Sequence, residues 1–526
     1  MDGARRETHT AVVTLLGDCA YKVKKPVRLA FVDFSTRAAR AVAAAREVAL
    51  NRRLAPDVYL GVGEWRGPDE PPGATGEPVV VMRRLPDDRR LATLVTHRRG
   101  HPDALTDPVR AIARRIAAFH ARAERSDAIA TAGHPEVVAA KFRADAQQTH
   151  ALVRDLPAPV RAHAPGPAPA EQVARIAALG AAYLAGRTTL LDDRVRAGLV
   201  VDGHGDLLAD DIFCLDDGPR ILDCLEFDDR LRWGDVLADV AFLAMDLEHL
   251  GAPTLAAQLL ADYATFSGAH HPPSLAHFHV AARALVRAKV AALRARQAAV
   301  ASTAGAVGEA DAARHDARAL LDLARRHLER GRVVCVLVGG VPGSGKSTLA
   351  RAIAPDLDAV VLASDEVRKE LAGLPHDGAG PAAYREGLYT DARTDATYAE
   401  LLARARTLLT RGVSVVLDAT WTRAAHRDAA RLTAATTHSG YRELECVASP
   451  PVAEARVLWR RASGPGPSDA TPAVAAALRA DADPWPTAVR LDADAPPAVV
   501  RTAARRALRQ PDPGSDPDFS APTTSP

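Results

Sequence analysis

Cysteine, methionine and aromatic residues are scarce in this sequence of 526 residues. It contains 5 cysteines and 3 methionines, and aromatic residues make up only 4%. The cysteines stand far apart without a C-x-x-C pair, which argues against a disulfide framework or a structural zinc site and favours reduced thiols. The few aromatic residues do not alternate with basic ones, so a base-stacking surface for RNA or single strands is poorly supported.

Long apolar runs and an excess of one charge are also missing. No stretch approaches the ~20 apolar residues that span a bilayer, and residues 1–7 lack the apolar core of a secretory signal. The 67 Lys and Arg against 65 Asp and Glu leave a formal net charge of +2, which argues against duplex-DNA binding. We therefore expect a cytoplasmic protein without membrane or duplex-DNA partners, and the oligomeric state stays open.

The sequence pattern divides the chain into two domains. Residues 1–300 begin with short β-rich segments and one helix and continue mainly as helices, which predicts an α+β domain. Residues 331–505 alternate continuous apolar strands with helices, which predicts an α/β domain with a parallel sheet. We expect a helical linker over 301–330 and a disordered tail over 506–526.

The strongest motif is a glycine-rich loop between a predicted strand and a predicted helix. The sequence GVPGSGKST at 340–348 fits the P-loop pattern G-x-x-x-x-G-K-[ST]. Its glycines let backbone N–H groups wrap around the phosphates of ATP, while Lys346 would reach the β- and γ-phosphates and Ser347 would hold Mg²⁺. A glycine-rich turn without function is the weaker interpretation. The expected nucleotide-binding residues are Gly340, Gly343, Ser344, Gly345, Lys346, Ser347 and Thr348.

Two aspartates close later strands of this half. Asp365 and Asp418 each follow an apolar run, at the strand ends where ligands gather in open α/β sheets. One would orient the acceptor hydroxyl or take its proton, and the other would hold Mg²⁺ through water; an N-cap role for Asp365 stays open. Arg456 and Arg460 lie on a predicted helix before a mobile loop at 464–468, where they would fold over the phosphates or form a solvated face.

Residues 332 to about 500 resemble small P-loop kinases of the gluconate kinase, chloramphenicol phosphotransferase and polynucleotide kinase type. The resemblance rests on the P-loop, on Ser-Asp-Glu-Val-Arg at 364–368, on Asp-Ala-Thr-Trp at 418–421 and on the two arginines named above. It implies that Asp365 is catalytic, that Arg368 handles the acceptor together with Asp365, and that Asp418 serves the metal.

An acidic cluster marks a second candidate site in the first half. Asp206 and Asp211 lie in the segment HGDLLADD, and Asp223 follows a predicted hairpin. Carboxylates this close repel one another unless a cation lies among them, so Asp206 would accept the acceptor proton while Asp211 and Asp223 hold Mg²⁺. The alternative is a hairpin with solvated acidic turns, which does not explain the apolar setting of Asp223.

Two strand lysines precede this cluster. Lys22 and Lys24 share one strand face, and Glu47 lies on the next helix. In protein-kinase-like folds a strand Lys paired with a helix Glu positions the α- and β-phosphates. We prefer Lys24 for this role, with Lys22 as the second choice.

Residues 1–300 resemble the aminoglycoside phosphotransferase and choline kinase group of protein-kinase-like folds. The resemblance implies that Asp206 is the catalytic Asp and Asp223 the metal-binding Asp, with His204 structural in the loop and Asp235 and Asp239 bracing it. Two features depart from the family: Asp211 stands where the family has a metal-binding Asn, and no clear Gly-rich loop precedes the strand lysines. The fused arrangement resembles bacterial proteins described as bifunctional aminoglycoside phosphotransferase-like and P-loop ATP-binding proteins.

These observations predict an ATP-dependent phosphotransferase (kinase) that uses ATP and Mg²⁺ on a small hydroxylated acceptor, with a second kinase-like site in the N-terminal half. One alternative is a polynucleotide 5′-kinase, against which the near-neutral charge speaks. Another is a nucleotide-responsive regulator whose N-terminal half is catalytically weak. Shared fold alone does not make an aminoglycoside the acceptor.

Overall fold

A computed structural model gives the structure of the chain. It describes residues 4–7, 10–29, 32–66, 75–98, 102–154, 167–300, 306–375, 387–462 and 471–509. The predicted mobile loop at 464–468 and nearly all of the predicted tail lie outside the described residues. The predicted tail started too early, because residues up to Leu508 continue a helix.

The chain divides into two compact units. Unit 1 comprises Met1–Ala181, Leu191–His271 and Leu275–Arg330, and unit 2 comprises Ala182–Leu190, Pro272–Ser274 and Gly331–Pro526. The described part of the expected linker is helix α11 (Ala306–Arg330), whose apolar side chains are buried and which belongs to unit 1. Within the described ranges no helix combines the length and apolar character needed to cross a membrane.

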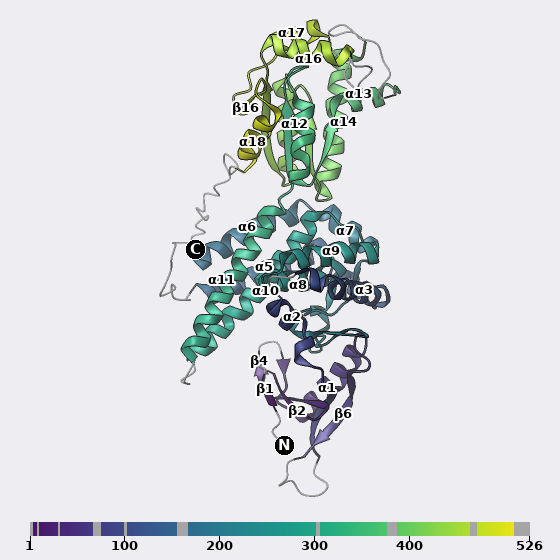
Figure 1. Cartoon of the computed structure of the whole chain (residues 1–526), viewed down its shortest axis with the longest axis vertical. Helices are drawn as coiled ribbons and strands as arrows, with labels where there is room; N and C mark the ends of the chain where they lie inside the picture. Colours follow the sequence, from purple (N-terminus) through teal and green to yellow (C-terminus); the bar gives the residue numbers. More distant parts are fainter. Residues whose placement is uncertain are drawn as a thin grey trace, which may run out of the picture. The chain divides into compact units, whose positions relative to one another are not determined.

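Unit 1 begins with an antiparallel sheet in the strand order β1-β2-β3-β7-β6, covered by helix α1 (Arg37–Asn51) (Figure 1). Thr36 starts this helix by accepting a hydrogen bond from the Ala39 amide at 3.2 Å. Ala44 and Val48 of α1 pack into one core with Val80 of the sheet. The strands are β1 (Ala4–Glu7), β2 (Ala11–Leu16), β3 (Cys19–Lys24), β6 (Tyr59–Trp65) and β7 (Glu77–Arg83), with a separate pair β4 (Arg28–Leu29) and β5 (Val32–Asp33).

The rest of unit 1 is mainly helical, with two small antiparallel ribbons that carry the acidic segment. The predicted hairpin is present as β9 (Ile212–Leu215) and β10 (Gly218–Ile221), and β8 (Val200–Asp202) pairs with β11 (Trp233–Asp235). The helices are α2 (Leu91–His97), α3 (Thr106–Arg122), α4 (Asp127–Thr131), α5 (Pro135–Val153), α6 (Pro169–Ala185), α7 (Thr188–Arg196), α8 (Val236–His249), α9 (Pro253–Ser267), α10 (Pro273–Val300) and α11.

Unit 2 is built on a parallel five-stranded sheet in the order β13-β14-β12-β15-β16. The strands are β12 (Val334–Gly339), β13 (Ala359–Ala363), β14 (Ser414–Asp418), β15 (Gly440–Val447) and β16 (Val489–Asp492). Helices α12, α14 and α18 run beside it (Figure 1). The helices are α12 (Lys346–Ile353), α13 (Ser364–Leu371), α14 (Asp391–Thr410), α15 (Ala424–Thr436), α16 (Pro450–Ala462), α17 (Pro472–Ala480) and α18 (Pro497–Leu508).

The core of unit 2 explains why β12 is a continuous apolar run. Val336 and Val338 pack with α12 and α18 through Leu349, Ile353 and Ala504, while the intervening Cys335 and Leu337 are also fully buried. A strand covered on both faces has no position for a polar side chain. The predicted fold class is confirmed: an α+β domain with an antiparallel sheet is followed by an α/β domain with a parallel sheet.

Candidate functional sites

The glycine-rich loop of unit 2 joins β12 to α12 in a conformation that requires glycine. Gly340, Gly343 and Gly345 have φ angles of +138°, +84° and +88°, a region that other residues rarely adopt. A Cβ atom on Gly343 would lie 2.2 Å from the carbonyl oxygen of Ala453 at the start of α16. The loop therefore packs closely against the backbone of α16 at Gly343. Its backbone amides lie just before the N-terminus of α12, which begins at Lys346.

Several polar atoms around this loop are buried without a protein partner. Ser344 Oγ and one carboxylate oxygen of Asp418 have no hydrogen bond within the described structure, and neither do Nε and Nη2 of Arg460. Lys346 is 8% exposed. Buried polar groups normally have partners, so unpartnered donors and acceptors beside a P-loop fit a bound triphosphate and its metal ion.

A pocket of about 330 Å³ adjoins the loop. Every loop residue from Gly343 to Thr348 lines it, and Arg456 and Arg460 of α16 form its other side. Arg456 Nη2 donates to the carbonyl of Ala493 at 2.9 Å, which fixes the guanidinium at the pocket wall. The two arginines predicted to cover the phosphates thus face the P-loop. Gly340 and Asp418 do not line this pocket in the described residues.

Asp418 ends β14 beside the loop. Burial raises the pKa of Asp418, while Lys346 and a hydrogen bond from Ser347 oppose that shift. A hydroxyl and a carboxylate in contact at the end of a P-loop are the donor set that Mg²⁺ takes together with phosphate oxygens. These residues fit the expected metal ion.

Asp365 lies at the mouth of a second, smaller pocket. It is in the first turn of α13 rather than at the N-cap, which is Ala363, so the N-cap interpretation of Asp365 is wrong. Its Oδ1 lies 3.2 Å from Nη1 of Arg368, and the Arg368 guanidinium stacks on Tyr389 at 4.6 Å from the ring centre. Arg368 Nε is buried without a partner among the described residues.

This second pocket has a volume of about 60 Å³ and shares Lys346 with the first. Its described lining also includes Asp365, Arg368, Thr420 and Arg423. Lys346 therefore lines both a pocket formed by the P-loop and a pocket whose described lining holds three aspartates (Asp365, Asp391 and Asp481) and two arginines (Arg368 and Arg423). Such a shared cation would neutralise charge on a group passing from one pocket to the other.

In unit 1 both predicted lysines contact Glu47, but they differ in their second partner. Lys22 Nζ lies 2.8 Å from Glu47 and 2.6 Å from Asp223. Lys24 Nζ lies 2.8 Å from Glu47 and also pairs with Glu226. Lys24 is 3% exposed. Both lysines thus form the predicted pair with Glu47, and which of them would position phosphates stays a prediction. Lys22 also connects Glu47 to the acidic cluster, while Lys24 is enclosed by two carboxylates.

The three aspartates of the cluster differ strongly in pKa. The pKa of Asp223 is lowered, mainly by Lys22, whereas burial and the nearby Asp223 raise the pKa of Asp211 well above its ordinary value. Burial raises the pKa of Asp206 to about 6, partly offset by Arg287. Asp223 also has a φ of +62°, which is strained for Asp. No group of three or more His, Cys, Asp or Glu side chains in the described ranges has the geometry of a complete metal site.

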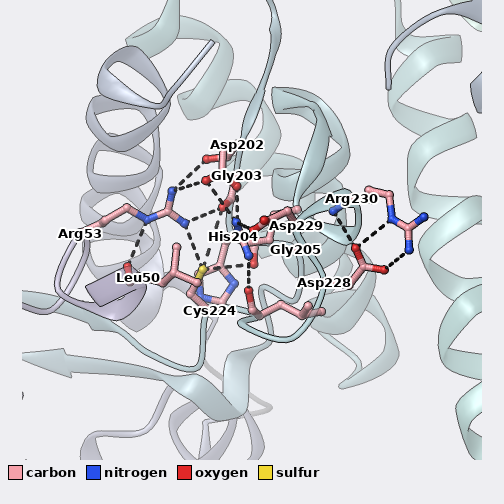
Figure 2. Close-up of polar contacts among 12 residues, drawn as sticks. Leu50, Arg53, Asp202, Gly203, His204, Gly205, Cys224, Asp228, Asp229 and Arg230 are labelled. Carbon is pink, nitrogen blue, oxygen red and sulfur yellow. Dashed lines mark hydrogen bonds and ion pairs between the residues drawn. The ribbon is translucent and has the colours of Figure 1, made fainter. Parts of the chain in front are cut away.

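The segment that carries Asp206 is held by an extensive hydrogen-bond network (Figure 2). Arg53, two residues after the end of α1, donates to the carbonyls of Asp202 and Gly203 at 3.1 and 2.9 Å and to the sulfur of Cys224 at 3.1 Å. His204 Nε2 lies 3.0 Å from the carbonyl of Leu222. The helix of the N-terminal sheet, the Asp206 loop and the segment after the hairpin are thereby tied together.

The carboxylate of Asp239 in α8 supports the same loop through hydrogen bonds. It accepts hydrogen bonds from the amides of His204 and Gly205 at 2.6 and 2.8 Å. His120 Nε2 lies 3.2 Å from the same carboxylate. The hydrogen bonds from His120 and from the backbone hold the pKa of Asp239 well below its ordinary value despite burial. Asp235, by contrast, caps α8 through Leu237 and pairs with Arg194.

Sequence reasoning missed Arg53, His120 and Glu226. Each contacts a residue more than 100 positions away, so local spacing carries no signal for the first two. Glu226 lies three positions after Asp223 and next to an apolar segment, which is a pattern that would have marked it as a buried carboxylate.

Comparison with known proteins places these sites in a family. Uncharacterized protein Rv2004c of Mycobacterium tuberculosis and uncharacterized protein Mb2027c of Mycobacterium bovis are each 43% identical over 491 residues, covering 93% of this chain and 92% of the relative. The chain belongs to the family of these mycobacterial proteins. A family model described as AAA domain matches residues 334–485, which contain the P-loop and the described lining of the smaller pocket.

Solved structures match parts of this chain. A gluconokinase from Sinorhizobium meliloti is 23% identical and covers 34% of this chain and 95% of its own, with a TM-score of 0.25. A choline kinase from Cryptosporidium parvum is 8% identical over 62% of this chain and 89% of its own, with a TM-score of 0.38. An aminoglycoside phosphotransferase from Alicyclobacillus acidocaldarius is 13% identical over 62% and 92%, with a TM-score of 0.29.

Proposed function

We propose that unit 2 is an ATP-dependent kinase for a small hydroxylated molecule. The observation that carries the proposal is the position of Lys346, which lines both the P-loop pocket and the pocket of Asp365 and Arg368. A phosphotransferase needs donor and acceptor on opposite sides of one group that neutralises charge. The two pockets supply that arrangement.

The chain's own residues have separable tasks in this proposal. The P-loop amides and Arg456 bind phosphates, and the Ser347–Asp418 contact holds the metal ligands in place. Arg368 orients the acceptor, and Asp365 accepts the proton of its hydroxyl group. ATP, when bound with Mg²⁺, would supply the phosphoryl group.

For unit 1 we propose a second nucleotide site formed by Lys22, Glu47 and Asp223, with Asp206 positioned to accept a proton. A regulatory role is the second candidate for this unit. It is favoured by Asp211, because burial and the nearby Asp223 raise the pKa of this carboxylate well above its ordinary value at a position where the resemblance implies a metal-binding Asn. A regulator that binds nucleotide but does not transfer phosphate would still function with Asp211 in place of that Asn.

The test is ATP consumption by the full chain with sugars, sugar acids, amino alcohols and aminoglycosides as acceptors. Asp365→Asn is expected to lower acceptor-dependent turnover by at least about 100-fold, within the range for loss of a positioned base, while ATP binding is retained. Glu366→Gln, at the next position of the same helix and outside the pocket lining, is the matched control and retains activity. Unchanged turnover in Asp365→Asn would contradict the proposal.

A further inference from the structure

A large cavity in unit 1 lies outside both candidate phosphate sites. Its volume is about 540 Å³, within the ~300–1,000 Å³ typical of small-molecule pockets. Helices α4, α5 and α10 and the strand β11 form its wall, which is mainly apolar and includes Phe142, Trp233 and Phe278. All of the lining residues belong to unit 1.

The acidic side chains of the cavity are already neutralised by cations. Each of the three lining aspartates has an ion pair with an arginine or a lysine. The pairs are Asp145 with Lys289 at 2.6 Å, Asp228 with Arg230 at 2.9 Å, and Asp235 with Arg194. An incoming cation would therefore find no free carboxylate among the described lining residues.

Two other cations of the lining, Lys141 and Arg283, form no direct ion pair among the described residues, although carboxylates act on both at longer range. Lys141 of α5 is accessible and makes no ion pair or hydrogen bond within the described structure. Arg283 of α10 uses its Nε for the carbonyl of Ala238 at 3.1 Å and has no carboxylate partner in the described ranges. Desolvation by the surrounding protein and the nearby Arg283 lower the pKa of Lys141 to about 8, while Asp145 and Asp228 oppose that shift. The two positive charges therefore lie close enough to repel each other.

A third lining group also lacks a partner. His279 is 7% exposed, and its Nε2 is buried with no hydrogen bond in the part of the chain that the structure describes. An apolar cavity whose lining holds two cations without an ion pair and a buried ring nitrogen without a hydrogen bond among the described residues favours a ligand with an apolar body and an anionic group.

We propose that this cavity binds a small molecule with an apolar body and one anionic group, and that Lys141 and Arg283 hold the anionic group. This chemistry is opposite in charge to an aminoglycoside or an amino alcohol. The inference concerns binding alone, so it stands or falls independently of whether unit 1 transfers phosphate.

The test uses two fluorescent probes that share one apolar skeleton. 8-Anilinonaphthalene-1-sulfonate carries a negative charge and N-phenyl-1-naphthylamine does not, and both are titrated into the full chain. Lys141→Met is expected to weaken binding of the sulfonate about tenfold, equal to ~1.4 kcal/mol, and to change binding of the neutral probe less than twofold. Ala282→Trp, which fills the cavity from α10, is expected to block both probes.

The control is Arg143→Met, which removes an exposed charge from the same helix α5 outside the cavity lining. It is expected to leave both affinities unchanged. Equal effects of Lys141→Met on the two probes, or no effect on either, would overturn the role of the cation. Undiminished binding in a folded Ala282→Trp variant would overturn the site, and the Lys141→Met comparison decides the proposal if that variant does not fold.

Discussion

Substituting alanine for Gly343 tests how the P-loop is built. The new Cβ would lie 2.2 Å from the Ala453 carbonyl oxygen and 2.9 Å from its carbon, where ordinary contact begins near 3.4 Å. The oxygen and the loop would have to separate by 3.4 − 2.2 = 1.2 Å. Both atoms belong to backbone, so no side chain can rotate to relieve the contact. The left-handed φ of +84° adds ~1–2 kcal/mol of strain for alanine.

The displacement falls on the segment whose amides would meet the phosphates. Loss of two backbone hydrogen bonds to a charged phosphate, at ~1.5 kcal/mol each, corresponds to about 100-fold in affinity. We therefore expect Gly343→Ala to weaken ATP binding to unit 2 by about 100-fold. Binding is measured with a fluorescent ATP analogue in a Lys22→Met background, so that unit 1 does not contribute.

Gly373 provides the matched control. It lies in unit 2 with a φ of +67°, and no atom of the described residues lies within 4 Å of the Cβ that alanine would add. Gly373→Ala should lose ~1 kcal/mol of stability from φ strain alone and bind the analogue normally. Equal binding by Gly343→Ala and Gly373→Ala would refute the reasoning, because the contact with α16 would then be irrelevant to the phosphate site.

Three further predictions concern unit 1. In urea titrations, Lys24→Met should lower the free energy of unfolding by ~3–5 kcal/mol, and Lys22→Met should lower it by clearly less. The reason is that only Lys24 is enclosed by two buried carboxylates. Equal losses in the two variants would contradict this prediction. Asp206 has a pKa raised to about 6, so its proton stabilises the fold at pH 4 and this contribution is lost as the pH rises through 6. Asp206→Asn should therefore raise the melting temperature at pH 8 but not at pH 4 in magnesium-free buffer. A higher melting temperature at pH 4 alone would contradict this prediction. Asp239→Asn should lower the free energy of unfolding by ~3 kcal/mol in urea titrations, because the NH₂ group of the asparagine side chain would replace one of the two oxygens that accept hydrogen bonds from backbone amides. A loss below ~1 kcal/mol would contradict the bracing role.

The sequence was most informative where chemistry and local structure coincide in a few neighbouring residues. The P-loop is such a case, because glycines at 340, 343 and 345 are required both by the positive φ angles and by the approach of phosphates. The parallel strands were also predictable, since β12 and β14 are buried on both faces and therefore read as continuous apolar runs.

The choice between the two strand lysines depended on contacts that no local pattern encodes. Lys22 and Lys24 share a face of β3, and both reach Glu47, so periodicity treats them alike. The two lysines differ in their second partners: Lys22 contacts Asp223 and Lys24 contacts Glu226, and each partner lies about 200 residues further along the chain. The same reason hides Arg53, whose partners are the carbonyls of a distant loop. The end of α18 was missed because its last turn carries Arg505 and Arg506 and its buried residues there, Ala504 and Ala507, are small.

The central claim is that the P-loop of unit 2 holds a nucleoside triphosphate through Lys346. The most direct measurement is equilibrium titration of a non-hydrolysable ATP analogue with Mg²⁺ into the full chain carrying Lys22→Met, compared with the same chain carrying Lys346→Met or Arg351→Met in addition. Arg351 lies on the exposed face of α12, so its substitution removes the same charge away from the loop. The account predicts one site per chain that is lost with Lys346→Met and kept with Arg351→Met. Undiminished binding in the Lys346→Met chain would contradict it.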